Sequence, residues 1–391
     1  MSKILVIIRY LILALILWGL PSFFLAYFSD SLGALTSVLS FGLLALFYFL
    51  IDFRGPILIS FIVLGLSYYI IGAFNYSGGL NDVEYFTMVL KYLLVIIPGA
   101  ELLRRTSLKE LYIFLLVGSL SVIIHTVFFP LQNAAFNASY GRFSGFYLNP
   151  NYAGAISLIG FALSFGIKDR RLKYVGYLIF SVAGFFTFSR YFLGMWMLMN
   201  VFSVFIKRRN LIVPLIGALF MIIVFALGPS LKLNEERFSA FASIFSSEET
   251  KTEVLGEDSR TNTWASYKDV ILDAPLWGNG FKKLQGDHFG IVAGVHNTFL
   301  LVIGEAGLIP FAILVSIYLF LLRRGFQAFK DSPHLAILAL VLFTALLVTH
   351  NYFDKFSILF ISMYLYIAFT EVEGFEKDSE QCRADLAERP L

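Results

Sequence analysis

Residues 296–322 read HNTFLLVIGEAGLIPFAILVSIYLFLL, a polar pair followed by a long apolar run. A membrane-spanning helix needs about 20 mostly apolar residues, and residues 297–322 meet that requirement. One carboxylate, Glu305, lies inside the run, and Gly307 and Pro310 indicate that the helix bends near it. The stretch therefore predicts a membrane helix that carries polar side chains in its first turns.

The whole chain shares this apolar character. Of its 391 residues, 58% are hydrophobic and only 15% are charged, whereas soluble domains are about 25% charged. This composition predicts an all-α polytopic membrane protein. The net charge of +3, with no dense basic patch, argues against a nucleic-acid partner. The single cysteine, Cys382, excludes an intramolecular disulfide, and no HExxH motif, DxD motif or P-loop occurs, so we expect neither a metal nor a cofactor.

Twelve stretches approach the length of a membrane span. The first resembles a signal sequence, but Arg9 interrupts its apolar run and no small-residue cleavage site follows. We interpret it as a retained helix and predict a bundle of about twelve transmembrane helices. Their approximate ranges are 4–27, 32–51, 56–74, 83–103, 108–130, 150–167, 172–188, 191–206, 210–229, 297–322, 334–350 and 354–372.

Basic residues set the predicted orientation. Short clusters such as KDRRLK and KRRN all fall on one side of the membrane, which is cytoplasmic by the positive-inside rule. The N-terminus is then cytoplasmic and one long loop is external. The predicted divisions are N-terminal helices 1–130, helices with external Arg and Asn motifs 131–229, the long external loop 230–296, C-terminal helices 297–372 and a cytoplasmic tail 373–391.

The sequence of the long external loop predicts secondary structure within the loop. NEERFSAFASIFSS (234–247) predicts a short amphipathic helix, and EDSRTNTWASYKDVILDAP (257–275) predicts a second. WGNGF (277–281) predicts a turn in which Gly278 and Gly280 adopt positive φ. Loops this long are usually functional or disordered, and these signals favour function.

Three arginines near the predicted external surface are candidate anion ligands. Arg190 stands at the tip of a tight hairpin between two spans. It either extends towards phospholipid headgroups or binds a phosphate-bearing ligand, because the guanidinium fork binds phosphate oxygens bidentately. Arg260 falls in the first turn of a predicted helix, where an anion is favoured, unless it pairs with Asp258 or Glu257. Arg142, which precedes the sixth span, is a third possible contact.

The other candidates lie where predicted spans begin. His296 has the titration range of a general base, although an interface histidine with satisfied hydrogen bonds is the alternative. Asn297 would orient the imidazole or a substrate hydroxyl. Asn149 and Asn151 flank a proline, as helix caps or as pocket residues. Glu305 lies deeper and should face the bundle interior, where a structural or gating role is favoured over catalysis.

Together these motifs resemble those of the O-antigen polymerase and O-antigen ligase superfamily of bacterial inner-membrane glycosyltransferases. The matching elements are RFSGFYLNPNYAG (142–154), FSR (188–190), SRTNTWASYKDVILDAPLWGNGF (259–281) and HNTFLLVIGEAGLIP (296–310). Each motif is short, but their order and sidedness are distinctive. The resemblance implies a metal-independent, inverting transfer of a glycan from an undecaprenyl diphosphate carrier, at the periplasmic face of the membrane.

The resemblance also implies roles for individual residues. Arginines hold the diphosphate, and a histidine near the end of the long loop acts on the acceptor hydroxyl. The predicted site therefore has His296, Arg190 and Arg260 as catalytic residues and Arg142, Asn149, Asn151, Asn297 and Glu305 as substrate-binding residues.

Several functions remain open at this point. FSGFYLNPNYAG looks more like the sequences of polymerases of O-antigen, capsule or exopolysaccharide repeat units. The alternatives are an O-antigen ligase that transfers glycan to lipid A–core, a protein-glycosylating relative, a transporter of lipid-linked glycan, and a membrane scaffold. A transporter is disfavoured because no internal repeat is present. Expected partners are a lipid-linked glycan donor, a glycan or lipid A–core acceptor, membrane lipids and a chain-length regulator protein.

Overall fold

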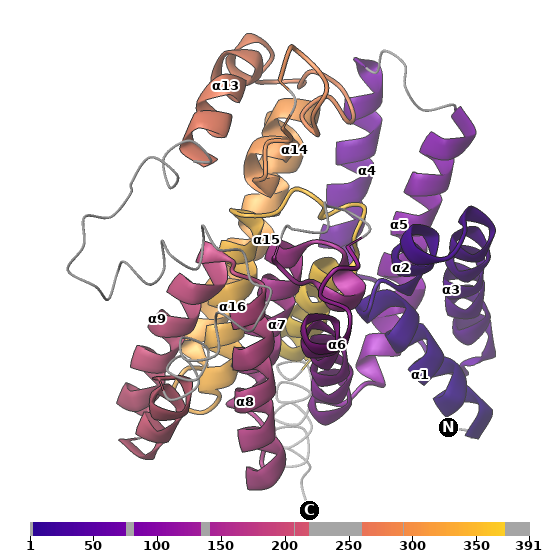
Figure 1. The fold of residues 1–391 in the computed structure, drawn as a ribbon. Coiled ribbons are helices and arrows are strands. Elements are labelled where there is room, and N and C mark those ends of the chain that lie inside the picture. Colours follow the sequence, from indigo (N-terminus) through magenta and orange to yellow (C-terminus); the bar gives the residue numbers. More distant parts are fainter. Residues whose placement is uncertain are drawn as a thin grey trace, which may run out of the picture.

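The computed structural model describes residues 3–75, 82–133, 141–206, 208–218, 260–291 and 293–371. These residues form helices and turns, and they contain no strand (Figure 1). The predicted helix at 234–247, residues 219–229 of the ninth predicted span and the tail 373–391 lie outside these ranges. In chain order the elements are α1 (Lys3–Leu17), α2 (Leu20–Tyr27), α3 (Asp30–Leu50), α4 (Ile59–Phe74), α5 (Asp82–Arg104), α6 (Leu108–Phe128), the short helix η1 (Gly145–Tyr147), α7 (Pro150–Ser164), α8 (Arg170–Phe186), α9 (Arg190–Ile206), η2 (Arg208–Leu211), α13 (Arg260–Asp273), α14 (Thr298–Ala306), α15 (Leu308–Gln327), α16 (Pro333–Leu346) and a helix at Ser357–Glu371.

Four of the described helices, α3, α5, α6 and α15, are long and apolar enough to cross a membrane. The bent pair of α1 and α2 is a fifth candidate, whereas α4, α16 and the helix Ser357–Glu371 are apolar but shorter. The protein is therefore an all-helical integral membrane protein in its described part. The count of about twelve spans and the external position of the long loop stay predictions.

Two predicted spans are interrupted in the structure. The first, 4–27, bends by 59° between α1 and α2. Gly19 at this break has φ 63°, and Pro21 stands in the first turn of α2, where its missing N–H is not needed. The tenth, 297–322, stops at Gly307, whose φ of 80° ends α14 before α15 begins. The bend predicted near Glu305 is thus a complete break in the helix.

Helix α7 is buried along nearly its whole length. Residues 152–164 are all buried, and α7 contacts α6, α8, α9 and α16. Small residues permit this close packing, which is how helices associate in membranes. At Gly160 a Cβ would collide with the ring of Phe180, and at Gly154 it would lie 3.1 Å from the Cβ of Ser189. The helix that begins at the candidate asparagines is therefore held rigidly.

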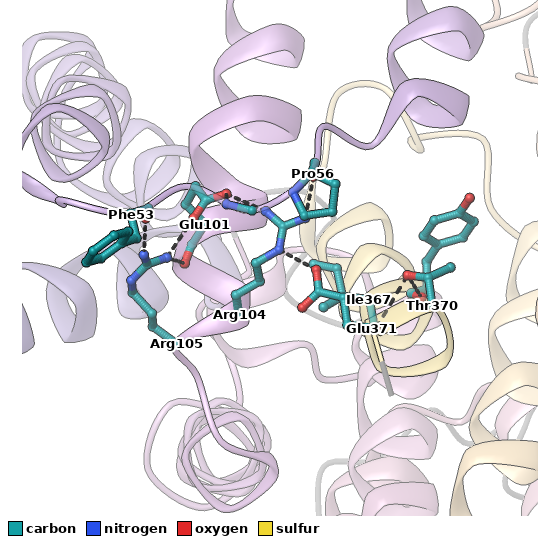
Figure 2. Close-up of polar contacts among 10 residues, drawn as sticks. Phe53, Pro56, Glu101, Arg104, Arg105, Ile367, Thr370 and Glu371 are labelled. Carbon is teal, nitrogen blue, oxygen red and sulfur yellow. Dashed lines mark hydrogen bonds and ion pairs between the residues drawn. The ribbon is translucent and has the colours of Figure 1, made fainter. Parts of the chain in front are cut away.

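A buried carboxylate connects α5 to two other segments. Glu101 is 2% exposed, and it accepts a hydrogen bond of 2.8 Å from the backbone N–H of Gly55. It also forms ion pairs with Arg104 and Arg105 (Figure 2). Arg104 pairs in addition with Glu371, at the end of the helix Ser357–Glu371. A buried charge is tolerated when it is paired and hydrogen-bonded, so this cluster has a structural explanation.

Candidate active site

Asn149 is the N-cap of α7. Its side-chain oxygen accepts hydrogen bonds from the backbone N–H groups of Asn151 at 2.9 Å and Tyr152 at 3.1 Å. Pro150 occupies the first helical position, where proline is favoured. The capping function predicted for the Asn-Pro-Asn motif is therefore present at Asn149. Asn151, by contrast, directs its side chain to an arginine.

Arg142 fastens the start of α7 to the turn between α8 and α9. Its Nη2 donates to Oδ1 of Asn151 at 2.7 Å, and its Nε donates to the carbonyl oxygen of Thr187 at 2.9 Å. Only 3% of Arg142 is exposed. Thr187 follows α8 directly and lies three residues before Arg190. Arg142 therefore positions the segment that carries Arg190.

Arg190 is the first residue of α9, and its side chain is exposed. Helix α8 ends at Phe186, so the tight hairpin predicted around SRY is confirmed. Phe188 adopts a φ of 46° inside this turn. The hairpin thus presents an exposed guanidinium group next to the segment held by Arg142.

We expect Arg142→Ala to destabilise the protein rather than remove a surface contact. Hydrogen bonds from charged donors contribute about 1.5–3 kcal/mol each, and the carbonyl of Thr187 would lose its charged donor. The free energy of unfolding should fall by about that amount, which is measured as a lower midpoint of thermal unfolding in detergent. Arg208→Ala is the control, because Arg208 is exposed. An unchanged midpoint for Arg142→Ala would mean that the turn is held by other contacts.

His296 precedes Asn297, the N-cap of α14, and adopts a φ of 47°, a conformation that few residues other than glycine, asparagine, aspartate and histidine accept readily. Its side chain is half-buried. Asn297 is the N-cap of α14: its Oδ1 accepts hydrogen bonds from the N–H groups of Phe299 at 3.0 Å and Leu300 at 3.2 Å. Asn297 is 4% exposed. The amide oxygen of Asn297 is thus engaged in capping.

A second histidine, His350, lies against His296. The two ring centroids are 4.4 Å apart, and the ring planes are inclined by 68°. Nδ1 of His350 is buried without a hydrogen-bond partner among the described residues. Burial, together with the charges of His296 and Lys355, lowers the pKa of His350 to about 3. His350 is therefore neutral near pH 7, so it adds no positive charge beside His296.

The segment 347–356 joins the two groups of candidate residues. It connects α16 to the helix Ser357–Glu371 and carries His350. Farther along it, Nζ of Lys355 donates to the carbonyl oxygen of Tyr147 at 3.3 Å and lies 5.2 Å from the ring centre of Tyr152. One loop thus contacts both His296 and the start of α7, where Asn149 and Asn151 lie.

Glu305 is fully buried in α14. It accepts a hydrogen bond from the hydroxyl of Tyr68 on α4 and another, of 3.0 Å, from the N–H of Leu284. The side-chain amide of Gln285 lies at 3.5 Å. Glu305 therefore faces the bundle interior, as its place in the apolar run predicts, and Tyr68 is its partner on another helix. These contacts connect α14, α4 and the segment after the WGNGF turn.

The described part of the long loop packs on α14. Helix α13 confirms the helix predicted within 257–275, and Gly278 and Gly280 have φ values of 72° and 106°, as the turn predicts. The N–H of Gly280 donates to the carbonyl of Glu305 at 3.0 Å. Arg260 is the first residue of α13, but its side chain lies outside the described part of the structure.

The role of segment 347–356 is not predicted from the sequence. THNYFDK (349–355) is a polar stretch at the end of a predicted span, but nothing in it assigns His350 or Lys355 to the site. The available signal for this segment was a group of polar residues at the end of an apolar run. Which residues of this segment lie beside His296 and Tyr152 depends on how α14, α16 and α7 pack together. No local sequence pattern contains that information.

A match to a known protein family covers much of the region that holds the candidate site. Residues 175–315 match the model of a family described as O-antigen ligase. No curated protein matches the chain. The matched residues include Arg190, α13, His296 and α14. The match supports a function of the O-antigen ligase or polymerase type, which implies a lipid-linked glycan as substrate. Through residues 175–315, the chain is similar to the O-antigen polymerase and ligase superfamily, which supports the resemblance drawn from its motifs.

Proposed function

We propose that the protein polymerises repeat units of a surface polysaccharide. In this reaction it transfers glycan from an undecaprenyl diphosphate donor to a sugar hydroxyl of the acceptor, at the external face of a bacterial inner membrane. The O-antigen ligase match over 175–315, which contains both Arg190 and His296, supports transfer of a lipid-linked glycan, and the stretch FSGFYLNPNYAG (143–154) favours the polymerase. The contact between His296 and His350 supports it, because it puts a neutral imidazole beside the proposed base.

The chemistry is a single displacement at the anomeric carbon of the donor. The acceptor hydroxyl oxygen forms the new bond, while the bond from the anomeric carbon to the diphosphate oxygen breaks. The diphosphate leaves with the electron pair, and the hydroxyl proton passes to His296. Attack opposite to the leaving group inverts the anomeric configuration. Because the diphosphate is already a good leaving group, positioning, charge stabilisation and one base supply what the reaction needs.

The role proposed for each site residue follows from its place in the chain and among its neighbours. Arg190 and Arg260 bind the diphosphate as bidentate donors. Arg142 positions the Arg190 hairpin through Thr187. The other proposed pocket residues are Asn149 and Asn151 at the start of α7, Asn297 beside His296, and Glu305, which holds α14 against α4.

The proposal is tested with the purified wild-type protein in lipid vesicles. When it is supplied with a repeat unit on undecaprenyl diphosphate and no nucleotide, the glycan should lengthen and free undecaprenyl diphosphate should accumulate. Electrophoresis of the glycan and chromatography of the lipid measure the two products. Movement of the donor between leaflets without lengthening would instead identify a transporter and overturn the proposal.

The second candidate is an O-antigen ligase, because the description of the matched family favours it. A ligase would leave the repeat unit at its original length and transfer it to lipid A–core added to the same vesicles. The mass of the acceptor lipid distinguishes the two activities. A chain-length regulator protein is a proposed partner only of the polymerase, where it would change the length distribution.

A further inference from the structure

A cavity of about 370 Å³ lies beside the candidate active site. It is lined by residues of α3 and α5, the break between α1 and α2, the start of α7 and the 347–356 loop. Its size falls in the range of roughly 300–1,000 Å³ that is typical of ligand pockets. None of the residues to which the proposed function assigns a role lines it.

The charged groups of this cavity come from three separate segments. Lys91 lies on α5, Lys282 follows the WGNGF turn, and Asp354 and Lys355 lie on the 347–356 loop. Three lysines and one carboxylate leave an excess of two positive charges when all four groups are ionised. We name this space the lysine cavity.

The lysines have no ion-pair partner among the described residues. The ion pairs seen among the described residues include those of Arg9, Arg104 and Arg105, and none of those seen involves the three lysines. Asp354 lies close enough to Lys282 and Lys355 to interact electrostatically, but not within 4.0 Å of either ammonium group. The positive charge of the cavity is therefore incompletely neutralised by the protein.

Among the three lysines, Lys91 gives the clearest indication of what the cavity binds. It is the tenth residue of the 23-residue helix α5, half-buried near the middle of a candidate membrane span. Its ammonium group lies 5.5 Å from the ring centre of Phe41, the one contact recorded for it in the described chain. A charged side chain at this depth is costly, and such residues are characteristic of substrate pathways. The position indicates that an anion enters the cavity.

Aromatic rings form much of the remaining wall. Tyr147, Tyr152 and Phe353 line the cavity together with serine hydroxyls. Tyr152 and Phe353 are buried and held by neighbouring rings, so the walls are rigid. Rings of this kind pack against the C–H faces of sugars, and hydroxyl groups bind sugar hydroxyls. Lysines among aromatic walls fit a sugar that carries an anionic group.

The cavity is linked directly to the proposed base. The loop 347–356 places His350 against His296 and, a few residues later, contributes Asp354 and Lys355 to the cavity. Tyr152, which follows the cap of α7, also lines it. The 347–356 loop thus joins the cavity to the contact with His296, the proposed base of the glycan transfer.

We propose that the lysine cavity binds a carboxylated sugar, such as a uronic acid, of the glycan substrate. The inference rests on the proposed function, because it takes the substrate to be a glycan. It goes beyond that function by assigning an acidic sugar to the repeat unit and by naming the residues that select it. The carrier diphosphate is the competing anion, and the experiment separates the two.

Binding is measured by calorimetric titration of the purified protein in detergent with a uronic-acid disaccharide and with its methyl ester. The ester keeps the shape of the acid and removes its charge. The wild-type protein should bind the acid roughly tenfold more tightly, or better, because hydrogen bonds to a charged group are the stronger ones. Lys282→Gln and Lys355→Gln should each weaken binding of the acid about tenfold and leave the ester unchanged.

Lys283→Gln is the matched control, since Lys283 adjoins Lys282 but does not line the cavity. It should bind acid and ester like the wild type. Equal affinities of the wild type for acid and ester, or absence of acid binding at millimolar concentrations, would overturn the proposal. So would displacement of the acid by inorganic diphosphate, if Lys282→Gln and Lys355→Gln also weakened diphosphate binding.

The two proposals fail in different ways. The titration needs neither donor nor catalysis, so a preference for the acid combined with no transfer to any acceptor overturns the proposed function alone. Normal lengthening of glycan in vesicles, combined with equal binding of acid and ester, overturns the lysine cavity alone.

Discussion

His296→Asn should lower the rate of glycan lengthening by roughly 10²–10⁴-fold, the contribution of a positioned general base. Asparagine is the appropriate replacement because His296 adopts a φ of 47°, and asparagine accepts this conformation better than alanine does. The fold should therefore persist while the titratable group is lost. The measurement is the initial rate of lengthening in lipid vesicles, at equal amounts of reconstituted protein.

His288→Asn is the matched control for this change. His288 lies in the same loop and is half-buried, and its backbone pairs with Ile291 while no side-chain contact is seen for it among the described residues. The control should retain the wild-type rate. A rate for His296→Asn within about threefold of the control would exclude His296 as the base that supplies the contribution expected above.

Arg190→Ala and Arg260→Ala should each lower the rate by roughly 10²–10³-fold, the loss measured when one preorganised donor is removed from a site where charge develops. The leaving diphosphate gains negative charge as its bond to the sugar breaks, so its stabilisation is required in the transition state. Lysine at either position should recover part of the rate, because it keeps the charge but loses the bidentate fork. Initial rates in the same vesicles measure both effects.

Arg208→Ala serves again as the control, since Arg208 is an exposed arginine outside the proposed site. Binding of undecaprenyl diphosphate should weaken in both arginine variants and remain unchanged in the control. If both Arg190→Ala and Arg260→Ala lengthened glycan at the wild-type rate, the diphosphate would have to be held elsewhere. The lysine cavity would then be the first place to examine.

Local signals in the sequence were sufficient for several elements. Asn149 and Asn297 cap helices as their positions predict, because capping depends only on backbone groups two or three residues away. The turn at Gly278 and Gly280 and the hairpin before Arg190 follow from equally short patterns.

Contacts between distant segments could not be predicted in this way. Arg142 is a candidate anion ligand in the sequence, but the structure buries it against Thr187 and Asn151. His350 was not singled out, yet its ring lies 4.4 Å from that of His296. These pairings depend on the depth and rotation of each packed helix, which are set by the side chains of the neighbouring helices.

Composition and local patterns were enough to predict a helical chain suited to a membrane and to locate the motifs that resemble those of the superfamily. Those properties follow from composition and from spacings of a few residues. The packing of the helices was needed to show that the 347–356 loop contacts both His296 and the start of α7, and that Lys91, Lys282 and Lys355 line one cavity. Lys91 and Lys355, which are 264 positions apart in the chain, meet there because the helices pack side by side, and no spacing along the chain encodes that packing.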